Sequence, residues 1–199
     1  MRVVLADYGA GNLRSVSSAF ARAGAEVEIS ADPGTVGSAP LAVIAGVGHA
    51  GAALAGLETR GLDEALRERA AAGRPLLGIC VGMQLLFEES DEGGAGLGLF
   101  KGPVKRLQAR RVPHMGWNAL RLEGEVPLLD GLAGADVYFA HSYSVRPTED
   151  LPRAEVDHDG PVVAAVQRGA LAGVQFHPER SAQAGARLLE NVMAWSRSA

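Results

Sequence analysis

The sequence is short of cysteine and lysine, and each shortage narrows the class of protein. Its one cysteine, Cys80, cannot form an internal disulfide, so its reactivity matters more than any cross-link. Only Lys101 and Lys105 among the basic residues are lysines, no basic cluster accompanies the arginines, and the net charge is −4. This balance gives no electrostatic reason to bind nucleic acid or an anionic membrane surface, so we expect neither partner.

Cofactor motifs are scarce as well. No two of the five histidines stand at metal-ligand spacing and there is a single thiol, so we predict no metal site. Gly9-Ala10-Gly11 has the form of a fragment of a dinucleotide-binding loop, but Arg14 stands where the third glycine would be. We therefore expect no cofactor.

Long apolar runs are also absent. No stretch of about 18 uninterrupted apolar residues exists, which excludes a membrane-spanning chain. The first residues hold no apolar segment long enough for a signal peptide, so we expect a cytoplasmic protein. Yet 47% of the 199 residues are apolar, too many for a disordered chain of small net charge. A chain of this length buries about two-thirds of its surface on folding, which predicts one domain over residues 1–199.

The first half of the chain alternates short apolar strands with helices. We predict strands at residues 2–6, 26–30, 41–45 and 75–79. We predict helices at residues 13–23, 63–72 and 81–89, the first of them with Asn12 as its N-cap and Gly24 just past its end. Apolar strands that alternate with helices are typical of a parallel sheet covered on both faces.

The second half has a different pattern. Strand-like segments at residues 103–108, 117–123, 136–141, 162–167 and 170–176 are joined by short turns, and a final helix is predicted at residues 183–197. We expect these strands to form hairpins at one edge of the sheet. The predicted fold is α/β, with an open, mixed, mostly parallel sheet, helices on both faces and antiparallel additions at one edge. Ligands bind at the carboxyl ends of such strands.

The segment Gly78-Ile79-Cys80-Val81-Gly82 has the form glycine-x-nucleophile-x-glycine, where a predicted strand turns into a helix. Glycines on both sides allow a tight, strained turn that projects the central side chain. A lone cysteine after an apolar strand is also typical of a small buried core residue. The spacing of the glycines favours a nucleophile.

Gln175-Phe176-His177-Pro178-Glu179 follows a predicted strand and supplies partners for that nucleophile. In extended backbone, the side chains of His177 and Glu179 point to the same side, so the carboxylate can orient the imidazole. A nucleophilic cysteine needs an oriented histidine as its base. A structural histidine beside a solvated glutamate is the alternative, and the pairing with Cys80 speaks against it.

Gly46-Val47-Gly48 is a candidate oxyanion loop. Acyl transfer needs two backbone N–H groups aimed at the developing negative oxygen. One is expected from Val81, directly after the nucleophile, and the other from the loop around Val47 and Gly48 at a neighbouring strand end. Without Cys80, the same glycines would indicate an ordinary strand-to-helix turn.

These residues resemble a known family. The motifs at residues 78–84 and 175–179 are similar to those of the class I (triad) glutamine amidotransferases. Residues 7–13, 113–118 and 138–143 resemble, more narrowly, the glutaminase subunits of imidazole glycerol phosphate synthases, which belong to that family. The similarity runs from residue 3 through the final helix. It implies a flavodoxin-like class I amidotransferase fold.

The resemblance implies that Cys80 attacks the carboxamide of glutamine, forms a glutamyl thioester and releases ammonia. His177, oriented by Glu179, would take and return the protons. The other implied site residues are Gln84, His141, Ser142 and Tyr143 for glutamine binding, Val47, Gly48 and Val81 for the oxyanion, and Asn12, Trp117, Tyr138 and Arg180 for a partner interface.

The implied partner is a (β/α)₈ cyclase subunit, with which the chain would form a heterodimer. Ammonia would pass to it without mixing with solvent and react with a phosphoribulosyl carboxamide nucleotide. The products would be imidazole glycerol phosphate and an aminoimidazole carboxamide ribotide, in histidine biosynthesis. We expect weak glutaminase activity alone and strong stimulation by the partner and its nucleotide.

Two positions depart from the family pattern. Ala45 stands where the oxyanion loop usually has proline, which loosens the loop entry and adds an N–H. Arg180 stands where lysine is usual, which replaces a point donor with a planar fork. Three alternatives stay open on the sequence: the glutaminase subunit of a different amidotransferase complex, a non-catalytic subunit with a vestigial triad, and a cysteine peptidase.

Overall fold

The computed structural model describes residues 1–198. Its main sheet has eight strands in the order β2-β1-β3-β4-β13-β12-β11-β8. The parallel part contains β2 (Glu26–Ser30), β1 (Arg2–Ala6), β3 (Leu41–Gly46), β4 (Leu76–Cys80) and β13 (Leu171–Val174). Antiparallel pairing then adds β12 (Pro161–Arg168), β11 (Arg153–Asp157) and β8 (Arg121–Glu123). The predicted mostly parallel sheet with antiparallel additions at one edge is confirmed.

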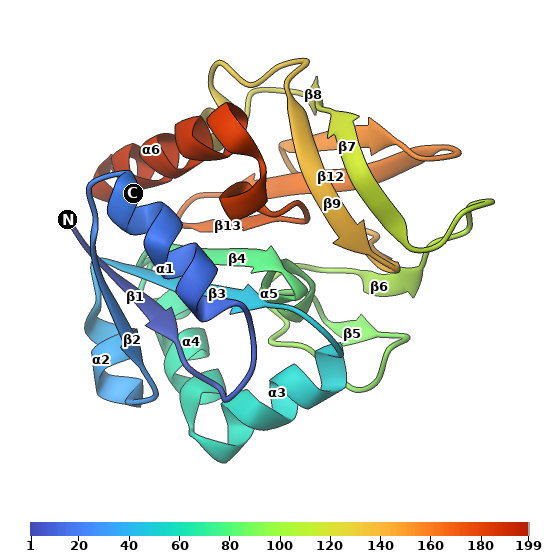
Figure 1. The fold of residues 1–199 in the computed structure, drawn as a ribbon. Coiled ribbons are helices and arrows are strands. Elements are labelled where there is room, and N and C mark those ends of the chain that lie inside the picture. Colours follow the sequence, from blue (N-terminus) through green and yellow to red (C-terminus); the bar gives the residue numbers. More distant parts are fainter. Residues whose placement is uncertain (199) are drawn as a thin grey trace.

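Helices cover both faces of this sheet, as predicted (Figure 1). On one side lie α1 (Leu13–Arg22) and α6 (Ala182–Ser198), and on the other lie α2 (Pro33–Ser38), α3 (Ala50–Thr59) and α4 (Leu62–Ala71). Helices α2 and α3 were not predicted, because α2 is a single short run of small residues and α3 is largely alanine and glycine with no clear apolar stripe. No helix within residues 1–198 is long and apolar enough to cross a membrane.

The helix predicted at residues 81–89 is shorter than expected. Helix α5 (Val81–Leu85) has only five residues, and β5 (Glu89–Ser90) follows it after a turn. Short 3₁₀ turns, η1 (Pro127–Leu129) and η2 (Pro178–Arg180), connect later elements. The compact α5 lies against β3, β4 and β13.

Two small sheets stand beside the main one, which corrects the expectation that all later strands join one edge. One sheet has the order β10-β6-β5, with β6 (Pro103–Arg106) and β10 (Tyr143–Val145), and the other pairs β7 (His114–Ala119) with β9 (Asp136–His141). The single strand predicted at residues 117–123 is wrong: the chain leaves β7 for β8 at Leu120, which is 1% exposed. The alternation of residues did not reveal this change of sheet.

The parallel pairing of β13 with β4 sets the site. Gly173 lies opposite Gly78 and Val174 opposite Ile79, so the two strands end at the same edge. Cys80 ends one strand and His177 follows the other. Two segments far apart in the sequence therefore meet at the carboxyl edge of the sheet, which is the edge expected to hold the ligand.

Candidate active site

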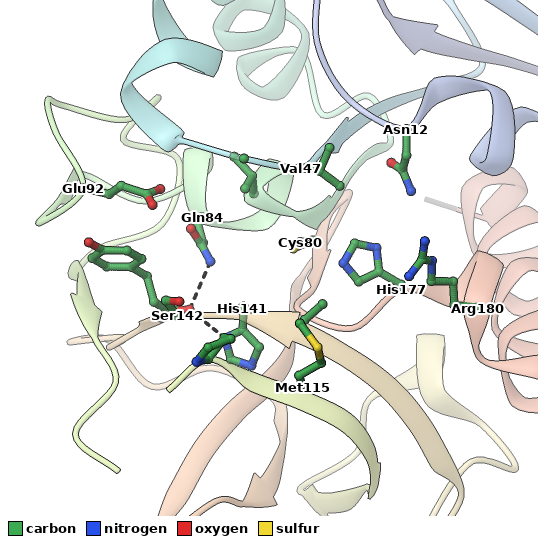
Figure 2. A pocket seen from close by; sticks show the side chains of 15 residues that line it. Asn12, Val47, Cys80, Gln84, Glu92, Met115, His141, Ser142, His177 and Arg180 are labelled. Carbon is green, nitrogen blue, oxygen red and sulfur yellow. Dashed lines mark hydrogen bonds between the residues drawn. The ribbon is translucent and has the colours of Figure 1, made fainter. Parts of the chain in front are cut away.

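Cys80 occupies a strained turn between β4 and α5. Its φ is +56°, a left-handed value that non-glycine residues seldom adopt. A Cβ on Gly78 would come within 2.5 Å of the Gly82 carbonyl oxygen, and a Cβ on Gly82 would collide with the Ile44 carbonyl oxygen. Both positions therefore need glycine, because the turn packs this closely against neighbouring backbone. The Cys80 side chain is nearly covered and faces a cavity of about 470 Å³ instead of bulk solvent (Figure 2).

His177 and Glu179 meet as predicted, but the backbone between them is not extended: Glu179 lies in the 3₁₀ turn η2. His177 Nδ1 lies 2.8 Å from Glu179 Oε1, and both side chains are buried. The imidazole lies at the cavity beside Cys80 (Figure 2). Burial lowers the pKa of His177, but hydrogen bonding to Cys80 and to the Glu179 carboxylate raises it more, to about 10. A protonated imidazole between the sulfur and the carboxylate is therefore favoured in the resting site.

Asn12 has a different role from the predicted cap. It stands at the N-cap position of α1, but its side chain makes no capping hydrogen bond. Its amide nitrogen instead donates to Glu179 Oε1, the oxygen that also contacts His177. The second oxygen of Glu179, Oε2, is buried with no partner among the described residues. Asn12 therefore helps to fix the carboxylate that orients the imidazole.

The predicted oxyanion residues Val47, Gly48 and Val81 all line the cavity. Gly48 has φ +93°, which a side chain would strain. Gly46 is needed for space, because a Cβ there would lie 2.8 Å from both the Tyr8 hydroxyl and the Val81 Cβ. The loop therefore packs closely against the turn that carries Cys80.

Tyr8 is a residue that the sequence argument missed. Its buried hydroxyl donates to the Ala45 carbonyl oxygen at 2.9 Å, directly before the oxyanion loop. Burial, and next the charge of Cys80, raise the pKa of Tyr8 far above its usual value, so the hydroxyl stays protonated as a donor. This contact fixes the loop entry at the position where the family proline is replaced. An aromatic hydroxyl at a strand end was the only available signal.

The four predicted glutamine-binding residues also line the cavity: Gln84, His141, Ser142 and Tyr143. Gln84 Nε2 donates to the Tyr143 carbonyl oxygen at 3.1 Å and to Gln175 Oε1 at 3.0 Å. Gln175 Nε2 in turn lies 3.6 Å from Cys80 Sγ. Gln175 belongs to the motif before His177 but received no role from the sequence, because its direction could not be read from spacing.

Glu92 is a second residue that the sequence argument missed. Its carboxylate lies across the cavity from His177 (Figure 2). Glu92 Oε2 accepts the Ala50 N–H at 2.8 Å, which holds the side chain at the start of α3. A carboxylate held in this way can bind an ammonium group. Glu92 is one of four acidic residues in the segment 88–92, so nothing in the sequence singled it out.

Of the predicted interface residues, Asn12 and Arg180 line the cavity, Tyr138 lies beside Arg180, and Trp117 lies beside Tyr138. Trp117 packs edge-on against Tyr138 with ring centroids 5.9 Å apart, and the Arg180 guanidinium lies 5.7 Å from the Tyr138 ring centroid. Trp117 is 54% exposed and its neighbour Met115 is 65% exposed. Arg180 and Met115 also line the cavity. The mouth therefore carries a partly apolar surface next to the site.

Within residues 1–198, no group of three or more His, Cys, Asp and Glu side chains is arranged to hold a metal ion. The arrangement offers a cysteine sulfur, an oriented imidazole and backbone N–H groups at the end of one sheet. These are the parts that acyl transfer through a thioester requires.

Comparison with known proteins agrees with this chemistry. The family model "Glutamine amidotransferase class-I" matches residues 4–194. A crystal structure of a glutamine amidotransferase superposes with a TM-score of 0.78 and 18% identity, covering 98% of each chain. The structure of PurLQS from Thermotoga maritima gives a TM-score of 0.79 and 19% identity, also covering 98% of each chain. The chain belongs to the class I glutamine amidotransferase family.

Curated relatives narrow this assignment. "Imidazole glycerol phosphate synthase subunit HisH" of Moorella thermoacetica is 46% identical over 194 residues, covering 95% of this chain and 92% of the relative. The protein of the same name from Mycobacterium tuberculosis is 46% identical over 196 residues, covering 95% of both. Within the class I family, this chain falls among these HisH subunits.

Proposed function

We propose that this chain is the glutaminase subunit of an imidazole glycerol phosphate synthase and acts in histidine biosynthesis. One observation carries the chemistry: Cys80, at positive φ, shares a cavity with His177, whose Nδ1 is hydrogen-bonded to Glu179. The similarity to relatives named HisH supports this complex in preference to a different amidotransferase complex. A cytoplasmic location, which suits a reduced catalytic cysteine, belongs to the same proposal.

In the first half of the reaction, the Cys80 sulfur attacks the carboxamide carbon of glutamine. The negative oxygen that forms is stabilised by the Val81 N–H and by a peptide N–H of the loop at Val47 and Gly48. His177 gives a proton to the nitrogen as the carbon–nitrogen bond breaks, so ammonia leaves and a glutamyl thioester remains.

In the second half, water replaces ammonia next to His177. The imidazole, now neutral, takes a proton from that water as its oxygen attacks the thioester carbon. The carbon–sulfur bond breaks, glutamate leaves and Cys80 is restored. Glu179 keeps its hydrogen bond to His177 Nδ1 throughout and so holds the other nitrogen toward the sulfur.

Glutamine would lie between Cys80 and the far wall of the cavity. Its α-ammonium group would pair with Glu92, and Gln84, Ser142 and Tyr143 would contact the rest of the molecule. A site of this kind accepts a free amino acid, because Glu92 needs an unblocked ammonium. This argues against a peptidase, whose substrate would carry an amide there.

The partner in this proposal is the (β/α)₈ cyclase subunit, in a heterodimer. Met115, Trp117, Tyr138 and Arg180 at the cavity mouth form the docking surface, which an exposed apolar patch of this kind suits. Asn12, the remaining residue of the predicted interface, lines the same cavity and contacts Glu179 directly, so the interface and the catalytic carboxylate are close in space. Ammonia would then pass from the cavity to the cyclase.

The test is an ammonia-release assay with glutamine, run with the chain alone, with the cyclase, and with the cyclase and its nucleotide. We expect weak turnover alone and at least a tenfold rise with cyclase and nucleotide together. Stimulation by a different synthase, and none by the cyclase, would refute the choice of complex. Equal turnover under all three conditions would refute control by the partner while leaving the glutaminase intact.

A further inference from the structure

A line of buried hydrogen bonds runs from strand β7 to the cavity. His114 on β7 faces His141 on β9 across the antiparallel pair, with His114 Nδ1 3.0 Å from His141 Nε2. His141 Nδ1 lies 2.7 Å from the Tyr143 carbonyl oxygen. Both rings are almost fully buried, at 4% and 6% exposed. His141 lines the cavity, but His114 does not, and nothing so far gives His114 a role.

The carbonyl at the inner end determines which nitrogens carry hydrogen. A carbonyl oxygen only accepts, so His141 Nδ1 must donate. Burial lowers the pKa of His141 to about 3 and that of His114 to about 4, so each ring is neutral with one N–H. His141 Nε2 is then an acceptor, and His114 Nδ1 must donate to it. His114 Nε2 is left as an acceptor, 3.5 Å from the Asn118 amide nitrogen.

The same carbonyl oxygen links the histidines to the nucleophile. The Tyr143 oxygen accepts from Gln84 Nε2 as well as from His141 Nδ1. Gln84 also donates to Gln175 Oε1, which turns Gln175 Nε2 toward Cys80 Sγ. The donor and acceptor roles are therefore consistent along the whole line, and a change of tautomer at His141 would set two donors or two acceptors against each other.

We propose that His114 is a positioning residue for the glutamine site: by donating to His141 Nε2 it holds that imidazole in place, and so fixes the Tyr143 carbonyl, which accepts from His141 Nδ1 and orients Gln84. The proposal rests on the proposed glutamine site. His114 contacts no substrate and acts only through His141.

The packing around His114 allows the hydrogen bond to be removed without removing the ring. His114 is stacked between Phe139, at a centroid distance of 4.5 Å, and His158, at 4.1 Å. Phenylalanine at position 114 keeps these stacks and loses the donor. His158 supplies a matched control, because its Nε2 bonds to the Arg111 carbonyl oxygen at 2.8 Å and takes no part in the line.

The first measurement reads the tautomer directly. The chain has five histidines, so ¹⁵N-labelled histidine gives a resolvable set of ring-nitrogen signals. We expect both His114 and His141 in the Nδ1–H form in the unaltered protein, and in His114→Phe a shift of the His141 Nε2 signal, because that nitrogen loses its donor. This readout needs no activity, so it tests His114 even if glutamine is not the substrate.

The second measurement separates binding from chemistry, with the cyclase and nucleotide present. His114→Phe should raise KM for glutamine roughly tenfold, with kcat within about twofold, because a buried acceptor loses its donor. His114→Asn places an amide N–H near the position of Nδ1 and should restore KM to within about threefold. His158→Phe should change neither parameter.

Three results would each overturn the proposal. They are a His141 Nε2–H tautomer in the unaltered protein, an unchanged KM in His114→Phe, and a KM in His114→Asn no better than that of His114→Phe. The last would mean that the imidazole only fills space. An unaltered protein with the expected tautomer but no glutaminase activity would instead count against the proposed function.

Discussion

The two halves of the chain bring different chemistry to one cavity. The first half, through the ends of β3 and β4, supplies the nucleophile Cys80 and the backbone of the oxyanion loop at Val47 and Gly48. The later half, through β9, β10 and the segment after β13, supplies the base His177 and the hydrogen-bonded imidazole of His141. The ends of buried, hydrogen-bonded strands hold peptide groups rigidly. Side chains make hydrogen bonds that a single substitution can remove. Rate and stability should therefore respond differently in the two halves.

The largest effect is expected where the halves meet. Cys80→Ala removes the sulfur that both halves serve, and turnover should fall by about 10⁴-fold or more. A rapid-quench search for a glutamyl thioester should find it in the unaltered protein and not in the variant. Ammonia release by Cys80→Ala at the unaltered rate would mean that the two halves do not converge on this sulfur.

The next effect isolates the later half. Glu179→Gln keeps the size of the side chain and removes its charge, so turnover should fall by about 10²-fold. It also removes one of the interactions that raise the pKa of His177 from 6.5 to about 10, so this pKa should fall. An NMR titration of the histidine ring measures the shift.

The same pKa has a consequence for stability, and its sign is fixed. His177 binds its proton more tightly in the folded than in the unfolded chain, so its contribution to the free energy of unfolding is present below pH 6.5 and is lost as pH rises through about 10. Denaturant unfolding between these pH values should show this loss in the unaltered protein and less of it in Glu179→Gln. An identical pH dependence of unfolding in the unaltered protein and in Glu179→Gln would contradict the role of Glu179 in raising the pKa of His177.

A smaller effect is expected from the backbone side. Tyr8→Phe deletes the hydroxyl that donates to the Ala45 carbonyl oxygen, which leaves the entry to the oxyanion loop less fixed. We expect kcat to fall about fivefold and the free energy of unfolding to fall by about 1 kcal/mol. Steady-state kinetics and urea unfolding measure the two. An unchanged kcat would show that β3 and β4 hold the loop without Tyr8.

The smallest effect on rate should accompany a clear loss of stability. Arg69 on α4 is 2% exposed. Its guanidinium donates to the Pro75 carbonyl oxygen, just before β4, at 2.7 and 2.9 Å and to the Val36 carbonyl oxygen in α2 at 3.0 Å. Arg69→Met leaves these oxygens without donors and should lower the free energy of unfolding by about 2–4 kcal/mol, with kcat unchanged. Arg22→Met, at an exposed arginine, should change stability by about 0.5 kcal/mol or less.

The same contrast explains what the sequence could predict. Strands β1, β3 and β4 are apolar runs followed by turn residues, and the residues that flank Cys80 are constrained by local geometry, so both could be predicted. The later half could not be assigned to sheets, because Leu120 continues the alternation of β7 although the chain changes sheet there. Alternation reports which face is buried, and it says nothing about which strand is the neighbour.

Side chains whose roles depend on distant partners were missed for a related reason. Tyr8 acts on Ala45, Gln175 on Cys80, and Glu92 across the cavity. None of these pairs has a spacing that periodicity can read, because each joins two separate strands or loops. The local pair of His177 and Glu179 could be found because residues only two positions apart can bring their side chains together, although the turn η2, and not extended backbone, makes the contact.

The insertion of β13 next to β4 has a consequence for how the protein is made. A chain that has not yet reached residue 177 has the nucleophile but no base, since β13 and His177 are synthesised well after β4 and Cys80. Incomplete or truncated chains are therefore unable to consume glutamine. Placing a late strand in the middle of the sheet makes the first turnover wait for a finished fold, so that free ammonia is not produced by fragments.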